Sequence, residues 1–328
     1  MRPITGIGNP LMDIIVPVDY TTFRNFEAEP GSMNLVENSV TKKILALPFE
    51  KTKTPGGSCA NTLRGIAWLA GSGYENKPYY MGAVGKDEAG DGFLAILVEQ
   101  GVEPGVALKD TPTGVSGILV TPDHERTMFT HLGACRDFTL EDVNMDAIRE
   151  SSYLHIAGYM WDTENQKEAA KEAVKTAGRN GVKVSFDLAD PFVVYRYGDE
   201  LREWLPGKVD LLFANREELS AMTEQKEDEA IMRIAREYAP FVVMKTGAEG
   251  CILRKGDEVI KIPGERVEPV DTTGAGDSFA AGFLYALLEG HGIDTAGRLA
   301  NRTASRIVTI EGCNYALLDL KEILSILG

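Results

Sequence analysis

The segment with the clearest chemical potential is residues 271–277, a stretch rich in threonine and glycine with an aspartate at each end. Directly after it, Phe279, Phe283 and Leu287 recur every four residues, which predicts a helix with one buried face that begins within the glycine turn. The N–H groups of a first helical turn have no partners inside the helix, and the helix dipole adds partial positive charge there. The turn is therefore a candidate binding site for an anion.

The aspartate at the mouth of this turn, Asp277, follows Gly274, Ala275 and Gly276. A carboxylate repels phosphate, so anion binding alone does not explain its place. It fits a general base that takes a proton from a hydroxyl group attacking a phosphoryl group. The alternative is that Asp277 caps the helix, as aspartate does at many first turns. The spacing alone leaves both interpretations open.

A second glycine turn, Gly56 and Gly57, precedes a predicted helix over residues 60–70. Paired glycines let the backbone approach a ligand closely. Asn61, in the first turn of that helix, can both donate and accept hydrogen bonds with sugar hydroxyls. An ordinary turn between a strand and a helix is the alternative here.

Two other polar sites follow predicted strands. Asp13 lies just beyond an N-terminal apolar strand, where strand ends of open α/β sheets supply ligand contacts; an aspartate in a solvated turn is the alternative, which the residues taken alone favour. Asn215 and Glu218 stand three residues apart after another strand, so they share one helix face and can organise Mg²⁺ and its waters. A capping pair is the alternative for these two residues.

Short apolar runs alternate with segments of helical periodicity from about residue 60 onward. The runs that predict strands are 79–84, 153–157, 182–186, 209–214 and 241–245. The segments that predict helices are 60–70, 92–100, 164–177 and 230–238. This alternation predicts an α/β fold with a doubly wound, mostly parallel sheet and helices on both faces.

Two regions, residues 14–36 and 113–131, break this rhythm, and neither has a predicted helix beside it. In the second, residues 115–121 and 126–131 flank the turn 122–125, which predicts a hairpin. We expect a small β lid made of about 13–37 and 110–132. The α/β core is then about 1–12, 38–109 and 133–328, and the whole chain 1–328 forms one functional unit.

The composition excludes several classes of protein. The chain has 44% hydrophobic residues and a net charge of −15 without a basic stripe, which argues against a nucleic-acid partner. Its four cysteines form no CxxC pair, which disfavours zinc and thiol redox sites. No apolar run is long enough for a membrane span and no leader pattern is found, so we expect a cytoplasmic protein without a membrane partner.

The motifs together resemble the PfkB, or ribokinase-like, family of carbohydrate kinases. Residues 271–279 match one family signature, and residues 55–61 with 82–87 match the other. The resemblance implies that Asp277 is the catalytic base, that the amides of Gly274, Ala275 and Gly276 hold the transferring phosphate, and that ATP is the donor. It also implies that Gly56 and Gly57 form the hinge of the lid, and that Asn61 and Asp13 bind the acceptor. Ribokinase carries a lysine where this chain has Ser58, so the acceptor pocket need not be that of ribokinase.

Further positions match the family by order and spacing. The resemblance implies that Thr246, Gly247 and Gly250 bind the nucleotide and that Asn301 contacts adenine. It also implies that Asn215 and Glu218 hold Mg²⁺ through water, and that Asp271 and Thr273 are placed to bind a monovalent cation such as K⁺.

The N-terminal residues 8–14 favour one class of acceptor, because they are similar to the corresponding stretch of adenosine kinases. The expected activity is therefore ATP-dependent phosphorylation of a primary hydroxyl on a nucleoside, adenosine-like, with a free sugar such as ribose or fructose as the alternative. A non-catalytic ligand-binding protein on the same fold is a third possibility. The resemblance also makes a homodimer through the lid plausible.

Overall fold

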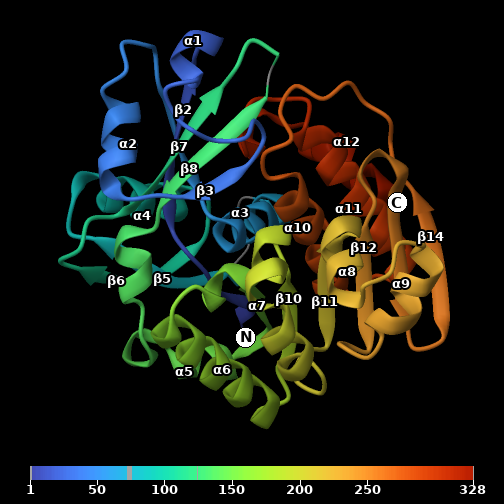
Figure 1. Cartoon of the computed structure of the whole chain (residues 1–328). Helices are drawn as coiled ribbons and strands as arrows, with labels where there is room; N and C mark the ends of the chain where they lie inside the picture. Colours follow the sequence, from blue (N-terminus) through green and yellow to red (C-terminus); the bar gives the residue numbers. More distant parts are fainter. Residues whose placement is uncertain (1, 72–75, 124, 328) are drawn as a thin grey trace.

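The computed structural model describes residues 2–71, 76–123 and 125–327. Within them, a nine-stranded sheet has the order β14-β13-β12-β11-β10-β9-β1-β5-β6 (Figure 1). Its strands are β1 (Arg2–Ile7), β5 (Tyr79–Gly85), β6 (Glu103–Lys109), β9 (Ser151–Ala157), β10 (Lys183–Asp187), β11 (Leu211–Asn215), β12 (Phe241–Lys245), β13 (Gly250–Lys255) and β14 (Glu258–Pro263). Pairing is parallel from β12 to β6 and antiparallel where β13 and β14 extend the edge.

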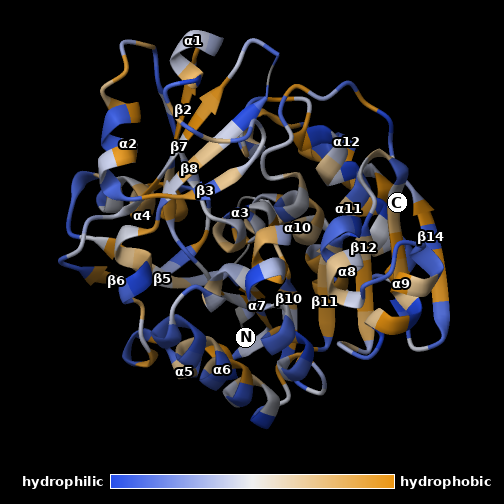
Figure 2. Cartoon of the chain, viewed as in Figure 1, coloured by the Kyte–Doolittle hydropathy of each residue, from blue (hydrophilic) through white to orange (hydrophobic). Residues whose placement is uncertain are grey.

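Helices cover both faces of this sheet, as its apolar strands require. On β11, Leu212 packs into one buried cluster and Phe213 into the other, because successive side chains of a strand point to opposite faces. The first cluster is covered by α5 (Met145–Arg149), α6 (Glu164–Arg179), α7 (Pro191–Trp204), α8 (Arg216–Thr223) and α9 (Asp228–Ala235). The opposite face carries α3 (Ser58–Ala70), α4 (Glu88–Glu99), α10 (Ala275–Leu288), α11 (Ile293–Ile307) and α12 (Leu320–Leu324). The predicted α/β fold is confirmed, and Figure 2 shows apolar strands beneath helices with polar outer faces.

A second, five-stranded sheet forms the lid, in the order β3-β8-β7-β2-β4. Its strands are β2 (Leu11–Pro17), β3 (Met33–Leu35), β4 (Thr52–Gly56), β7 (Gly114–Val120) and β8 (Arg126–His131). β7 and β8 pair antiparallel, so the predicted hairpin is confirmed; His124, in its expected turn, lies outside the described residues. The lid stands over one end of the main sheet (Figure 1).

The boundaries predicted for the lid were wrong in one respect. The first lid segment was expected to end at residue 37, yet β4 joins the lid by pairing antiparallel with β2. Between them, α2 (Asn38–Leu45) packs Ile44 against Phe129 of β8, beside the short helix α1 (Tyr20–Phe23). The lid therefore does have a helical partner. The sequence hid β4 because residues 52–54 are polar and its pairing is supplied by a distant strand.

No helix in the described parts of the chain is both long enough and apolar enough to cross a membrane.

The junction between β4 and α3 requires a glycine at position 57. Gly57 has φ of 95° and precedes α3, and a methyl group there would collide with the backbone oxygen of Asn9. Gly181 has a similar φ of 71° but open space around its Cα. An alanine at either position would therefore adopt an unfavourable left-handed backbone, but only an alanine at position 57 would also collide with a neighbour.

We predict that Gly57→Ala lowers the free energy of unfolding by about 3 kcal/mol or more, from left-handed backbone cost plus overpacking. Gly181→Ala should lose only about 1 kcal/mol, because it carries the backbone cost alone. Urea unfolding of both variants measures the difference. Equal losses would show that contact with Asn9 does not constrain this junction.

Candidate active site

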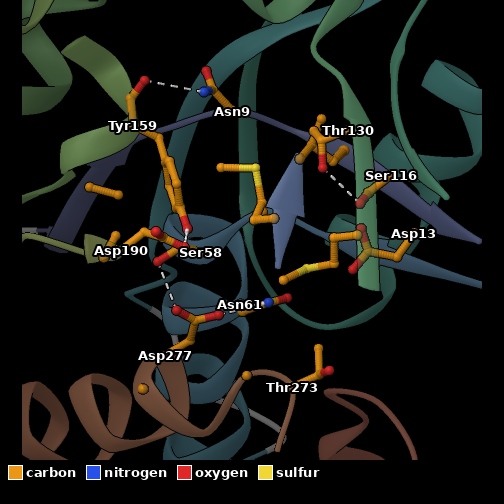
Figure 3. Close-up of a pocket in the computed structure, with 18 of the residues that line it drawn as sticks. Asn9, Asp13, Ser58, Asn61, Ser116, Thr130, Tyr159, Asp190, Thr273 and Asp277 are labelled. Carbon is orange, nitrogen blue, oxygen red and sulfur yellow. Dashed lines mark hydrogen bonds between the residues drawn. The ribbon is translucent and has the colours of Figure 1, made fainter. Parts of the chain in front are cut away.

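A cavity of about 600 Å³ lies between the lid and the carboxyl ends of the main-sheet strands (Figure 3). Ala157, Asp187 and Lys245 end β9, β10 and β12 and all line it. From the other side, Leu11 and Met128 reach it from lid strands. The carboxyl edge of an open α/β sheet is where such folds bind ligands, so this cavity is the candidate active site.

The predicted anion-binding turn forms the floor of the cavity. Gly274, Ala275 and Gly276 all line it, and α10 begins at Ala275. Gly274 is the N-cap with φ of 74°, and a side chain there would meet Cys313 Sγ at 2.7 Å. The N–H of Ala275 already bonds to Thr272 O at 3.2 Å and so stabilises the turn itself. The open helix end still presents its partial positive charge to the cavity.

Asp277 does not cap α10. Its carboxylate turns towards α3, where Ser58 Oγ donates to Oδ1 at 2.7 Å and Asn61 Nδ2 donates to Oδ2 at 2.9 Å (Figure 3). Burial raises the pKa of Asp277, while the Asn61 and Ser58 hydrogen bonds oppose that rise. The carboxylate is thus fixed in direction and placed above the helix end, which suits a base that acts beside a bound phosphate.

The pairing of Asp277 with Asn61 depends on a close helix crossing. A methyl group on Gly65 of α3 would lie 2.6 Å from Ala281 Cβ of α10, so glycine lets the two helices approach. Arg64, which the sequence analysis missed, then fixes the amide: its Nη1 donates to Asn61 Oδ1 at 2.8 Å. With its oxygen occupied, Asn61 must present its NH₂ to Asp277. The sequence signal that could have identified Arg64 was an arginine three residues after Asn61, on the face of the predicted helix that is buried.

Arg64 is nearly fully buried and ties several segments together. Its Nη1 also donates to Pro55 O at 3.1 Å, and its Nη2 donates to Cys313 O at 3.0 Å. A buried guanidinium needs such partners to offset its loss of water. One side chain therefore links the end of the lid, the base and the loop below the phosphate turn.

Asp13 lies on β2 opposite Ser116 of β7 and lines the lid side of the cavity. A side chain at Gly56 would overlap the Asp13 carboxylate, so the first glycine of the predicted pair makes room for it. Burial raises the pKa of Asp13 to about 7, although Arg126 and Arg64 lower it. A polar ligand with hydroxyl groups would supply the hydrogen bonds that this carboxyl group otherwise takes from water.

The predicted monovalent-cation residues have other partners. Asp271 Oδ2 accepts hydrogen bonds from Arg126 Nη1 at 2.5 Å and Gly312 N at 2.7 Å, and Oδ1 accepts one from Thr273 N at 2.9 Å. Arg126, another residue that the sequence analysis missed, comes from the lid. Its guanidinium already balances the Asp271 carboxylate, and binding of K⁺ by Asp271 and Thr273 stays a prediction.

Asn215 and Glu218 form the capping pair that was the alternative to metal binding. Asn215 Oδ1 accepts from Glu218 N at 2.8 Å, and Glu218 Oε2 accepts from Asn215 N at 2.8 Å. Glu218 is buried, which raises its pKa to about 7, and neither residue is among those that line the cavity. The described residues contain no cluster of three acidic, histidine or cysteine side chains for a metal. The binding of Mg²⁺ through water by this pair stays a prediction.

The predicted nucleotide-binding residues lie beyond this cavity. Thr246 donates its N–H to Gly250 O at 2.9 Å, closing a turn that contains Gly247. Asn301 is buried in α11 and donates to Ile262 O at 3.3 Å and Pro263 O at 3.1 Å. Its amide hydrogens thus serve the end of β14, and contact of Asn301 with adenine stays a prediction.

One buried ion pair at the cavity was absent from the sequence analysis. Lys245 Nζ donates to Asp187 Oδ2 at 2.9 Å and Oδ1 at 3.1 Å. Both residues end main-sheet strands and both line the cavity. Their positions as the last residues of strands on the ligand-binding edge were the only available signal.

The fold and the cavity point to a phosphotransferase, with the Asp277 carboxylate beside the open end of α10. The chain matches the model of the pfkB family carbohydrate kinases over residues 31–320. A solved adenosine kinase from Sinorhizobium meliloti is 30% identical, with a TM-score of 0.91 and coverage of 100% of this chain and 99% of that one. A solved probable sugar kinase from Rhizobium etli is 32% identical, with a TM-score of 0.91 and coverage of 99% and 98%. A nucleoside kinase from Methanothermobacter thermautotrophicus is 31% identical over 81% of this chain and 82% of its own.

The chain belongs to the pfkB carbohydrate kinase family. It is an ATP-dependent small-molecule kinase with an alcohol group as acceptor, as predicted. ATP and typically Mg²⁺ accompany this family, whereas K⁺ activation stays a prediction.

Because the pKa of Asp13 is raised in the folded protein, we predict that the free energy of unfolding depends on pH. Between pH 3.8, the ordinary pKa of an aspartate, and about pH 7, the folded protein holds a proton on Asp13 that the unfolded chain releases. The free energy of unfolding should therefore fall as pH rises through this window. Asp13→Asn cannot titrate and should show a shallower fall between about pH 5 and about pH 7, measured by urea unfolding.

Asp110→Asn is the matched control, because the exposed Asp110 pairs with Lys86 and its pKa lies below 3.8. Asp110 is thus ionised in both states across this window and its variant should keep the wild-type slope. An Asp13→Asn slope equal to wild type would mean that Asp13 is ionised in the folded protein.

Proposed function

We propose that the chain transfers the γ-phosphoryl group of ATP to the primary hydroxyl of a nucleoside, adenosine-like in shape. The observation that carries this proposal is the two-part lining of the cavity. Asp13, Asn61 and Asp277 make one end polar. The lid adds an apolar wall from Leu11, Met33, Leu35, Met128 and Leu132. A sugar alone has little apolar surface to bury against such a wall, whereas a nucleoside base has a flat apolar face.

In the proposed reaction, the ribose hydroxyls bind near Asp13 and Asn61, and the primary hydroxyl points at Asp277. The oxygen of that hydroxyl attacks the γ-phosphorus, and the bond from phosphorus to the β–γ bridging oxygen breaks. The proton of the hydroxyl passes to Asp277. Gly274 to Gly276 stabilise the transferring group through the open end of α10. Mg²⁺ neutralises phosphate charge when it is bound with ATP. The lid excludes water and so limits hydrolysis of ATP.

The names of similar proteins support this choice without deciding it. The matched relatives include adenosine and nucleoside kinases and also proteins named sugar kinases. A free sugar therefore remains the competing acceptor that the assay must include.

Pairing of two copies through the lid stays a separate prediction. Val40 and Ile44 of α2 pack on the lid with Phe129, so this helix covers part of its outer face. A second copy would have to pair around α2 or along the edge strands. The expected cytoplasmic location is likewise still a prediction.

We predict that Mg²⁺-ATP turnover requires a nucleoside and that Asp277→Asn lowers kcat by about 10²–10⁴-fold, the usual contribution of a general base. Acceptor affinity should persist, because Asn keeps the size of the side chain. A coupled ADP assay with adenosine, other nucleosides, ribose and fructose makes the measurement. ADP release that ignores both the acceptor and the substitution would instead indicate hydrolysis or a contaminant.

The apolar wall gives a second prediction. Met128→Ala should raise the KM for adenosine about tenfold, since the lost contact is worth about 1.4 kcal/mol, and should leave the KM for ribose nearly unchanged. Comparing the two acceptors on one variant controls for general damage. An equal change in KM for adenosine and ribose would show that the nucleoside base does not contact Met128.

A further inference from the structure

Lys245 occupies an unusual place for a buried lysine. It is the last residue of β12, and its side chain is only 14% exposed. A methyl group built on Gly276 would lie 3.2 Å from Lys245 Nζ. The ammonium therefore rests directly against the glycine turn that forms the anion site, on the same cavity as Asp277.

Several carboxylates lie near the glycine turn, so binding of a nucleotide phosphate there requires a nearby positive charge. Asp187 and Asp277 line the cavity, and Glu218 is close enough for Lys245 and Asp187 to act on its pKa. Carboxylates repel a polyanionic nucleotide. Among the described residues that line the cavity, the basic ones are Lys245 and Arg126, and Arg126 bonds to Asp271. Lys245 is thus the basic group placed at the phosphate turn itself.

Asp187 aims this ammonium. Its two oxygens accept from Nζ, and Oδ1 also accepts from Ala189 N at 3.0 Å. Ala189 has φ of 71°, a strained conformation for a non-glycine residue that is found preferentially at functional sites. An ammonium has three N–H donors, so a single carboxylate does not use them all. The remaining donor capacity adjoins Gly276.

We propose that Lys245 is a catalytic residue, whose ammonium donates a hydrogen bond to the phosphoryl group during its transfer, and that Asp187 positions it. This inference rests on the proposed phosphotransfer at the same site. The bond changes are unaltered: the acceptor oxygen bonds to phosphorus, the bridging oxygen leaves with ADP, and Asp277 takes the proton. Lys245 keeps its proton throughout and offsets negative charge on the transferring oxygens.

The test separates kcat from binding. Lys245→Met should lower kcat about 100-fold or more, the usual effect of removing one such donor, while the KM for the acceptor changes less than threefold. Lys245→Arg should recover part of kcat, because it restores the charge with a different shape. The matched control is Lys167→Met, which removes another largely buried lysine; Lys167 lies on α6, pairs with Glu200 of α7 and is outside the cavity. It should keep wild-type kcat.

A double variant distinguishes catalysis from structural support. Lys245→Met alone leaves Asp187 unpaired, which can destabilise the fold for reasons unrelated to catalysis. Lys245→Met with Asp187→Asn removes both charges, so its melting temperature should recover towards wild type while kcat stays about 100-fold low. If kcat recovers together with the melting temperature, Lys245 is structural and the inference is overturned.

A binding readout completes the test with the same proteins. Affinity for ADP with aluminium fluoride, a mimic of the transferring phosphoryl group, should fall at least tenfold in Lys245→Met, and affinity for ADP alone should change less than threefold, by calorimetry. Equal losses for both ligands would overturn the catalytic role. A wild-type protein without acceptor-dependent turnover would refute the proposed function, whereas wild-type turnover with a fully active Lys245→Met would refute only this inference.

Discussion

The contact between the first turns of α3 and α10 is the constraint on which the site depends. Gly65 lets the two helices approach, and their N-terminal ends then bring Ser58 and Asn61 to the Asp277 carboxylate. Neither helix could place a base alone, since a carboxylate at a first turn tends to cap its own helix. Here Gly274 is the N-cap, so Asp277 can bond across to the neighbouring helix. The same helix packing therefore places both the glycine turn and the carboxylate that we propose as the base.

Charge at the cavity is arranged around this contact. Asp271 is matched by Arg126 and Asp187 by Lys245, so two carboxylates carry their own cations. Asp13 and Asp277 have raised pKa values because burial outweighs the groups that stabilise their charge. A buried carboxyl group with a raised pKa holds a proton more firmly than it would in water, so it is poorly suited to bind phosphate but well suited to accept a proton from a hydroxyl. The arrangement separates carboxylates that are neutralised from those that remain available for chemistry.

Much of the fold was predictable because the buried parallel strands read as apolar runs: residues 241–245 were predicted as a strand and form β12. Asp277 and the glycine turn were recognisable because local chain chemistry defines them. Lys245, Asp187 and Arg64 were not, because their importance comes from contacts between segments far apart in the chain. For the same reason β4 was missed: its residues 52–54 are polar, and only pairing with β2 makes them a strand.

The missed strand changes the physical interpretation of the lid. β4 ends at Gly56 and α3 starts at Ser58, so a single glycine separates the lid from the helix whose side chains bond to the Asp277 carboxylate. Arg64 bonds to Pro55 on one side of this junction and to Asn61 on the other. A rotation of the lid about Gly57 would therefore act on Asn61 both through the chain and through the guanidinium. Because Asn61 donates to Asp277, such a rotation would also change the direction of the Asp277 carboxylate, and an acceptor bound beneath the lid would then help to align the group that we propose as its base.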